Sequence, residues 1–210
     1  MGRIAVKDLA ASEGPQQVVI ADRDTDLARQ VVNLLPQGRS KVSVVHTDVT
    51  DRAKLLDTLR GADAVLNAVH YYFNLEVMRA CLEVGAHYTD LGGLFHLTRK
   101  QLELHDEFAA AGLSAVLCMG SAPGVPNVQA RYAADRLDTI ESIRIYDGIL
   151  PLAGDDIRFG YAIPTIMDVL VMPPLVYRDG EFVAEEPLGG EEGGGCEPPG
   201  GRLRGPRSLR

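Results

Sequence analysis

The sequence predicts an α/β fold built on a parallel sheet, on the strength of two observations. Short apolar runs alternate with helical segments of about ten residues from the start of the chain to Gly124. These runs are nearly continuous, which is typical of strands that are buried on both faces of a parallel sheet. The composition, 46% hydrophobic and 24% charged, is that of a globular protein. We therefore expect strands joined by right-handed crossover helices.

The chain opens on a predicted helix over residues 2–11, and strands and helices then alternate. The predicted strands are 18–22, 42–48, 64–69, 87–91 and 114–120. Residues with side-chain oxygens are expected to cap the intervening helices: Asp24, Thr50 and Asn74. Thr98 and Gln101 have the spacing of a capping box, which predicts a helix over 98–111.

The pattern changes after Gly124. Residues 140–146 alternate like a strand with one solvated face, 164–171 predict a helix, and 175–183 predict a hairpin turning at Asp179-Gly180. This division predicts three regions, a first domain over 1–123, part of a second domain over 124–188, and a disordered Gly/Pro/Arg tail over 189–210.

Charge and cysteine content exclude several classes of function. A net charge of −8 and an isoelectric point near 5.1 argue against a nucleic-acid surface and a membrane anchor. No apolar run reaches the length of a membrane span, and the first residues do not resemble a signal peptide. The three cysteines form no C-x-x-C pair, and no His, Cys and carboxylate spacing predicts a metal site. We expect a cytoplasmic protein without a metal.

Asp22 is the main indication of a nucleotide cofactor. It ends a predicted strand and follows Gly2 by 20 residues, the spacing between the last glycine of a dinucleotide-binding turn and the acid that binds the adenine ribose. Taken alone, Asp22 is better explained as an ordinary strand-end acid or helix cap, because such acids are common. Arg23 is suited to a 2′-phosphate, so NAD and NADP both remain open as the cofactor.

Residues after the third and fourth predicted strands are further candidates for cofactor binding. In open parallel sheets, ligands bind beyond the carboxyl ends of the strands. Asp48 and Val49 would lie near the adenine, and Asn67, Ala68 and Val69 near the nicotinamide ribose. Asp48 is also a candidate cap for the helix that follows it.

His70, Tyr71 and Asp90 are the candidate catalytic residues, with Tyr72 and His96 expected close by. Removal of hydride from a carbon that bears an amine requires the neutral amine, and hence a base within hydrogen-bond reach. Histidine suits this role, and a tyrosine hydroxyl or a carboxylate can position the substrate. The simpler alternative is that the aromatic residues pack a loop against the sheet.

Three motifs in order resemble the saccharopine dehydrogenase family, and within it the lysine 6-dehydrogenase branch. They are LNAVHYYFN over 66–74, YTDLGG over 88–93 and GSAPGVPN over 120–127. The resemblance implies a Rossmann domain, a second α/β domain that closes over an amino-acid substrate, and NAD- or NADP-dependent hydride transfer at a CH–NH group. It also implies that Gly2 is the last glycine of the phosphate-binding turn and that Asp22 is the ribose acid.

The chain also departs from the pattern of this family at both ends. The resemblance implies a first strand and two glycines ahead of Gly2, a longer second domain, and no Gly/Arg tail. We therefore expect a fragment whose sheet has exposed edges, which favours a homo-oligomer. The expected function is oxidation of an amino acid such as lysine or saccharopine. The alternative is a non-catalytic truncated paralogue that binds dinucleotide weakly or serves as an interaction module.

Overall fold

The computed structural model describes residues 1–145 and 162–189. The chain divides into two compact units, Met1–Leu152 and Ala153–Arg210. This division falls later than the boundary predicted after residue 123, because the helix that begins at Gly124 belongs to the first unit. Residues 190–210 of the predicted tail lie outside the described residues.

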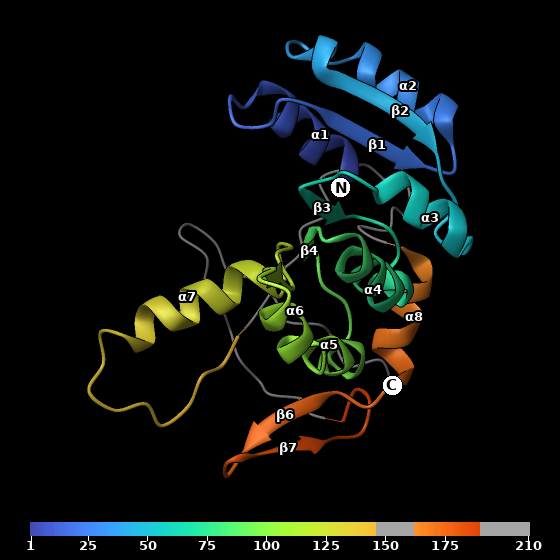
Figure 1. Ribbon diagram of the computed structural model, residues 1–210. Coiled ribbons are helices and arrows are strands. Elements are labelled where there is room, and N and C mark those ends of the chain that lie inside the picture. Colours follow the sequence, from blue (N-terminus) through green and yellow to red (C-terminus); the bar gives the residue numbers. More distant parts are fainter. Residues whose placement is uncertain (146–161, 190–210) are drawn as a thin grey trace, which may run out of the picture. The chain divides into compact units, whose positions relative to one another are not determined.

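The first unit contains parallel strands, which confirms the predicted α/β class (Figure 1). One sheet pairs β1 (Val18–Asp22) with β2 (Val42–His46). The other has the order β3 (Ala64–Asn67), β4 (His87–Asp90) and β5 (Ala115–Val116). All three ladders are parallel. The carboxyl ends of the strands in each sheet therefore lie at a common edge, where ligands bind in folds of this type.

Helices precede the first of these strands, connect the strands and follow the last one. They are α1 (Gly2–Ala11), α2 (Thr25–Asn33), α3 (Arg52–Leu59), α4 (Asn74–Val84), α5 (Phe95–Leu102), α6 (His105–Ala110) and α7 (Gly124–Ala134), with the short 3-10 turns η1 (Arg39–Lys41) and η2 (Tyr71–Phe73). In the part of the chain that the structure describes, no helix has both the length and the apolar character needed to cross a membrane.

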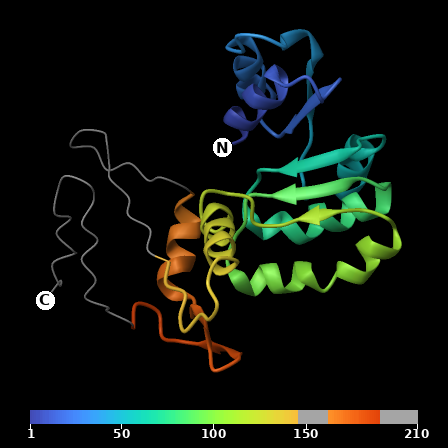
Figure 2. The same cartoon turned by 90° about the vertical axis from the view of Figure 1, so that its left-hand side faces the viewer.

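The main hydrophobic core joins α3, α4 and α6 to β4. Figure 2 shows helices packed along one face of the sheet that contains β4. Met78 and Cys81 of α4, Tyr88 of β4 and Phe108 of α6 are among its buried members. The opposite face of this sheet is less covered. The register aligns Leu66, Thr89 and Val116 in one row, in which Leu66 is 39% and Val116 48% exposed.

The helix starts agree with the sequence only in part. Asp24 caps α2 as predicted, and its Oδ1 accepts from the backbone N–H of Leu27 at 2.9 Å. The prediction that Thr50 caps the next helix was wrong, because Asp51 accepts from the backbone N–H of Lys54 at 3.0 Å. Asn74 begins α4 but does not cap it, because η2 precedes the helix directly.

Two further elements differ from the prediction. The helix predicted over 98–111 is two helices, and α5 already begins at Phe95. Thr98 and Gln101 therefore lie inside α5, and the predicted capping box does not form. Residues 140–145 of the predicted strand are not in a strand, and Tyr146 lies outside the described residues.

The described part of the second unit matches the prediction closely. It contains α8 (Ile163–Val171), with a proline in its first turn, and a hairpin of β6 (Leu175–Arg178) and β7 (Glu181–Ala184). Asp179 and Gly180 both have positive φ, of 53° and 87°. A two-residue hairpin turn of type I′ requires positive φ at both positions, which explains the Asp-Gly sequence.

Candidate functional site

The N-terminus of α1 has the features of an anion-binding helix end. Met1, at the N-cap, provides no side-chain hydrogen bond, and the first turn contains no acid. The first backbone N–H groups of such a helix have no partner within it, and they carry the positive end of the helix dipole. A Cβ placed on Gly2 would lie 3.8 Å from the Cβ of Ala68. The structure thus brings Gly2 beside the residue that follows β3.

A charged group of side chains lies at the carboxyl ends of β1 and β2. Asp22 pairs in register with His46, and its carboxylate is exposed and accepts from the backbone N–H of Asp24 at 2.8 Å. Arg23, the next residue, is exposed as well. The pKa of Asp48 is lowered by hydrogen bonds from the backbone and hydroxyl of Thr50, and less strongly by the charges of Arg23 and His46. The structure therefore brings together three of the predicted cofactor-binding side chains.

Val49, the fourth residue predicted on the adenine side, packs against the hydrophobic core. Its side chain supports the fold, and its neighbour Asp48 faces the charged group.

Asn67, at the end of β3, has a buried side chain. Its Nδ2 donates to Asn74 Oδ1 at 2.9 Å and to the hydroxyl of Tyr88 at 3.2 Å. Ala68 and Val69, which follow it, are exposed. The Asn67 amide is engaged inside the protein, and its Oδ1 also accepts from the backbone N–H of Val69 at 3.4 Å, so Ala68 and Val69 are the exposed ones among these three predicted residues.

Aromatic rings cluster directly after β3. The ring of His70 lies 4.9 Å from that of Tyr71 and 4.2 Å from that of Tyr72, and the His96 ring is 6.4 Å from Tyr71. Nδ1 of His70 accepts from the backbone N–H of Tyr72 at 3.4 Å. Tyr71 is only 4% exposed, and a Cβ on Gly93 would come within 2.6 Å of its ring. The structure thus brings His70, Tyr72 and His96 together around a buried Tyr71.

Asp90, the third predicted catalytic residue, is 1% exposed and fully hydrogen-bonded. Its Oδ1 accepts from the backbone N–H groups of Gly92 and Cys118, both at 2.8 Å. Its Oδ2 accepts from the Tyr88 hydroxyl at 3.0 Å and from Gln101 Nε2 at 2.8 Å. A carboxylate has about four lone-pair positions, so Asp90 has none available for a substrate proton. We therefore do not retain Asp90 as a proton acceptor.

Two residues of this network, Tyr88 and Gln101, were not identified from the sequence. Alternation along β4 places Tyr88 on the same face as Asp90, and this was a usable signal. The sequence placed Gln101 in a capping box, a local role that does not predict its contact with Asp90. The network joins β3, β4, α4 and α5 at the carboxyl edge of the sheet.

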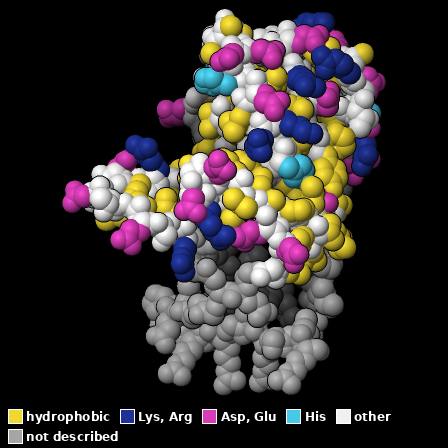
Figure 3. Space-filling model, turned by 90° about the horizontal axis from the view of Figure 1, so that it is seen from below, with side chains coloured by type: hydrophobic (Ala, Val, Ile, Leu, Met, Phe, Trp, Pro, Cys, Tyr) yellow, Lys and Arg dark blue, Asp and Glu magenta, His cyan; other side chains and the backbone are white. Residues whose placement is uncertain are grey.

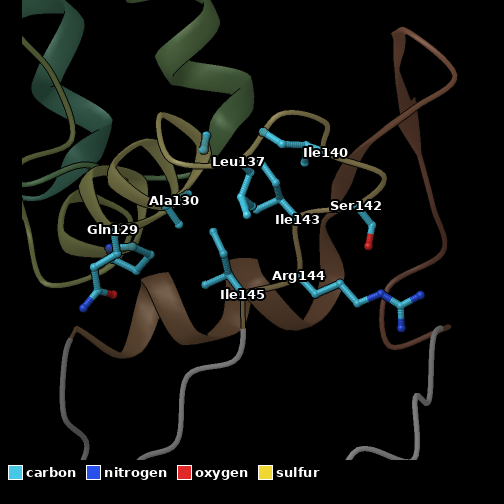
Figure 4. Close-up of a pocket in the computed structure, with 11 residues that line it drawn as sticks. Gln129, Ala130, Leu137, Ile140, Ser142, Ile143, Arg144 and Ile145 are labelled. Carbon is cyan, nitrogen blue, oxygen red and sulfur yellow. The ribbon is translucent and has the colours of Figure 1, made fainter.

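A separate hollow of about 450 Å3 lies between α7 and residues 140–145 (Figure 4). Its walls are mostly apolar, with Leu137, Ile143 and Ile145 among them. Arg144 contributes the one charged side chain of this lining. The hollow contains none of the predicted catalytic residues, so its size alone does not make it the site of chemistry.

The comparison with protein families gives a clear result. The family described as Saccharopine dehydrogenase NADP binding domain matches residues 1–116, more than half of the chain. The chain belongs to this family. The resemblance to the saccharopine dehydrogenase family is thereby confirmed, and so is NAD(P) as the cofactor, whereas the lysine 6-dehydrogenase branch stays a prediction. The donors around Gly2, together with Asp22 and Arg23, fit phosphate and ribose groups of such a nucleotide.

Several curated proteins are similar to the chain. Carboxyaminopropylagmatine dehydrogenase of Synechocystis is 30% identical over 155 residues, which cover 70% of this chain and 39% of that protein. Carboxynorspermidine synthase of Vibrio cholerae is 32% identical over 115 residues, 48% of this chain and 28% of that protein. A trans-acting enoyl reductase of Mycobacterium leprae is 29% identical over 136 residues, 62% of this chain and 32% of that protein. The chain thus spans less than half the length of these relatives.

Among solved structures, the apo saccharopine dehydrogenase (L-Glu forming) of Saccharomyces cerevisiae is similar in fold. The TM-score is 0.63 at 19% identity, and the match covers 89% of this chain and 42% of that one. The match agrees with the Rossmann-type fold of this family.

Proposed function

We propose that this chain carries the cofactor-binding part of an NAD(P)-dependent oxidoreductase that transfers hydride at the CH–NH group of an amino acid such as lysine or saccharopine. The observation that carries this proposal is the closeness of Gly2 to Ala68, whose Cβ would lie 3.8 Å from a Cβ placed on Gly2. It places an uncapped helix N-terminus beside the segment that leads from Ala68 to the His70 and Tyr71 cluster. A pyrophosphate bound at this helix end would leave the nicotinamide near that cluster. The names of two relatives, a carboxyaminopropylagmatine dehydrogenase and a carboxynorspermidine synthase, denote amine derivatives and support this class of substrate.

A bound nucleotide would accept the hydride in the oxidation of the amine, and the residues of the chain would bind and orient the reactants. The helix end at Gly2 would hold the pyrophosphate, and Asp22 or Arg23 the adenine ribose or its phosphate. His70 is the first candidate for the group that takes the amine proton, and His96 is the second, because imidazole titrates near neutral pH. Tyr71 is buried and acts as the support for both rings.

The test of this function begins with a thermal melt of the chain alone and with saturating NAD or NADP. A ligand that binds only the folded state raises the transition temperature. Turnover with lysine or saccharopine would then be followed by nicotinamide absorbance, in the wild type and in His70→Gln and His96→Gln. The variant that lacks the base should lose turnover while its melt still responds to nucleotide. A melt that neither nucleotide shifts would contradict the proposal.

Two other outcomes have specific support. A melt shifted by nucleotide without turnover on any amine would indicate the non-catalytic alternative, a dinucleotide-binding module. Reduction of an enoyl substrate would match the 29% identical enoyl reductase of Mycobacterium leprae.

We place the protein in the cytoplasm, and fractionation of cells would test this.

We further propose that the chain associates with itself. Leu66 and Val116 are exposed on one sheet face, and Val128 and Tyr132 of α7 are each 62% exposed. Figure 3 shows hydrophobic side chains distributed over the visible surface. Exposed apolar residues that share one sheet face, such as Leu66 and Val116, favour association, so light scattering during gel filtration should give a mass above 22.7 kDa. A monomeric mass would exclude this.

A further inference from the structure

The Asp90 carboxylate is buried without a cation to balance it. Its four donors are two backbone N–H groups, the Tyr88 hydroxyl and the Gln101 amide. All four are neutral, and within residues 1–145 and 162–189 no ion pair involves Asp90. Neutral donors satisfy the hydrogen-bonding capacity of a carboxylate but leave its charge in place. The site therefore contains a fixed negative charge below its surface.

Neighbouring groups respond to this charge. Burial raises the pKa of Tyr88 above its ordinary value, and the charge of Asp90 raises it further. Burial also raises the pKa of the Cys118 thiol, again with a contribution from Asp90. Both shifts oppose the formation of a second negative charge nearby. The same field must favour a positive charge in the same region.

Asp90 is the last residue of β4, and its carboxylate is bound by two closely packed segments that follow β4 and β5. Gly92, which donates to Asp90, has a φ of +94°, which favours glycine. A Cβ on Gly93 would overlap the Tyr71 ring, and one on Gly120 would come within 2.3 Å of the Leu91 carbonyl oxygen. The segments 91–93 and 118–120 therefore pack with backbone against backbone. Electrostatic interactions of a buried charge such as that of Asp90 are stronger than in water.

We propose that Asp90 is a specificity-determining residue that favours the oxidised over the reduced nicotinamide cofactor. The oxidised ring is a cation and the reduced ring is neutral, so a buried anion close to the ring binds the oxidised form more strongly. The inference rests on the proposed function, because it requires the nicotinamide to lie at the carboxyl ends of β3 and β4. One consequence is that the bound reduced cofactor becomes a better hydride donor.

The test compares dissociation constants for NADP⁺ and NADPH, measured by calorimetry on the full chain and on Asp90→Asn. Removing this buried charge should shift the ratio of the two constants about tenfold against NADP⁺, the order of magnitude expected for a charge roughly 10 Å away at an effective dielectric constant of about 20. A tenfold shift corresponds to about 30 mV in the potential of the bound two-electron couple. If Asp90 has a purely structural role, Asp90→Asn will weaken the binding of NADP⁺ and NADPH equally. That result would overturn the proposal.

Tyr88→Phe is the matched control. It removes one hydrogen bond from the same carboxylate but keeps the charge, so it should lower stability without changing the ratio. If Asp90→Asn does not fold, as judged by circular dichroism, Gln101→Lys provides the second test, because an ammonium beside Asp90 neutralises the charge and keeps the carboxylate. An unchanged ratio in Gln101→Lys would overturn the proposal. A wild type that binds neither form would instead refute the proposed function, and this inference with it.

Discussion

Gln101 of α5 donates a hydrogen bond to the Oδ2 of Asp90 at 2.8 Å, and this contact ties the helix to the end of β4. Both side chains are 1% exposed. Replacing Gln101 by Leu should therefore lower the free energy of unfolding by about 2–3 kcal/mol, because one bond to a charged acceptor is lost in the interior. Urea denaturation measures this. The exposed Gln30→Leu on α2 is the control, and an equal loss in both variants would contradict the prediction.

Gly93→Ala should disturb the aromatic cluster through steric overlap alone. The added Cβ would meet the Tyr71 ring at 2.6 Å, and no positive φ is recorded at this position. Overpacking of this kind costs about 1–3 kcal/mol. Gly14→Ala, where a Cβ would meet nothing within 4 Å, should change stability little. Thermal melts of the two variants test the difference, and equal melting temperatures would show that Tyr71 moves aside freely.

The sequence predicted the sheet because strand and helix periods are local properties. The apolar runs over 18–22 and 64–69 correspond to β1 and β3, and Asp24 has the local geometry of a cap. Thr98 and Gln101 show the limit of such reasoning. Their spacing is that of a capping box, yet α5 begins three residues earlier and directs Gln101 to a carboxylate 11 residues away in the sequence. A contact between separate elements has no local periodicity that would reveal it.

The candidate site was predicted in position better than in role. Asp22, Arg23 and Asp48 do come together, because the ends of parallel neighbours must. Asp90 also lies at the predicted edge. Whether a strand-end acid faces solvent or the interior depends on the helices that cover it, and here Tyr88 and Gln101 enclose it. Residues 140–145 do not form the predicted strand. Alternation of apolar and polar residues does not show whether a partner strand is present to pair with.

Asp22 and Arg23 should determine the choice between NAD and NADP. Both are exposed at the end of β1, so their replacement should leave the fold intact. Arg23→Ala should weaken NADP binding about tenfold and spare NAD, because a charge-assisted bond to the 2′-phosphate is lost. Asp22→Asn should weaken the binding of NAD more than the binding of NADP. Arg29→Ala is the control, since Arg29 pairs with Asp26 on α2. Affinities are measured by calorimetric titration. If each variant binds NAD and NADP with equally reduced affinity, Asp22 and Arg23 do not select between the two nucleotides.

Cys81 should make the protein sensitive to alkaline pH. Burial raises the pKa of its thiol to about 12, whereas the unfolded chain should have a value of about 8.5. The folded state therefore keeps the proton that the unfolded state releases. The contribution of Cys81 to the free energy of unfolding is complete below about pH 8.5 and falls by about 1.4 kcal/mol per pH unit as the pH rises toward the folded pKa. Tyr88, whose pKa is also raised, adds to the loss at still higher pH.

Cys81→Ala separates the packing contribution of Cys81 from the effect of its thiol ionisation. The variant should be less stable than the wild type by a constant amount between pH 6 and 8, because a buried sulfur atom is lost from the core at about 1 kcal/mol. Above about pH 9 the gap should narrow and then reverse, since the variant has no thiol to ionise on unfolding. Urea denaturation across this pH range measures the gap. A difference that stays constant to pH 10.5, about two units above the pKa of a free thiol, would show that Cys81 is accessible to water in the folded protein.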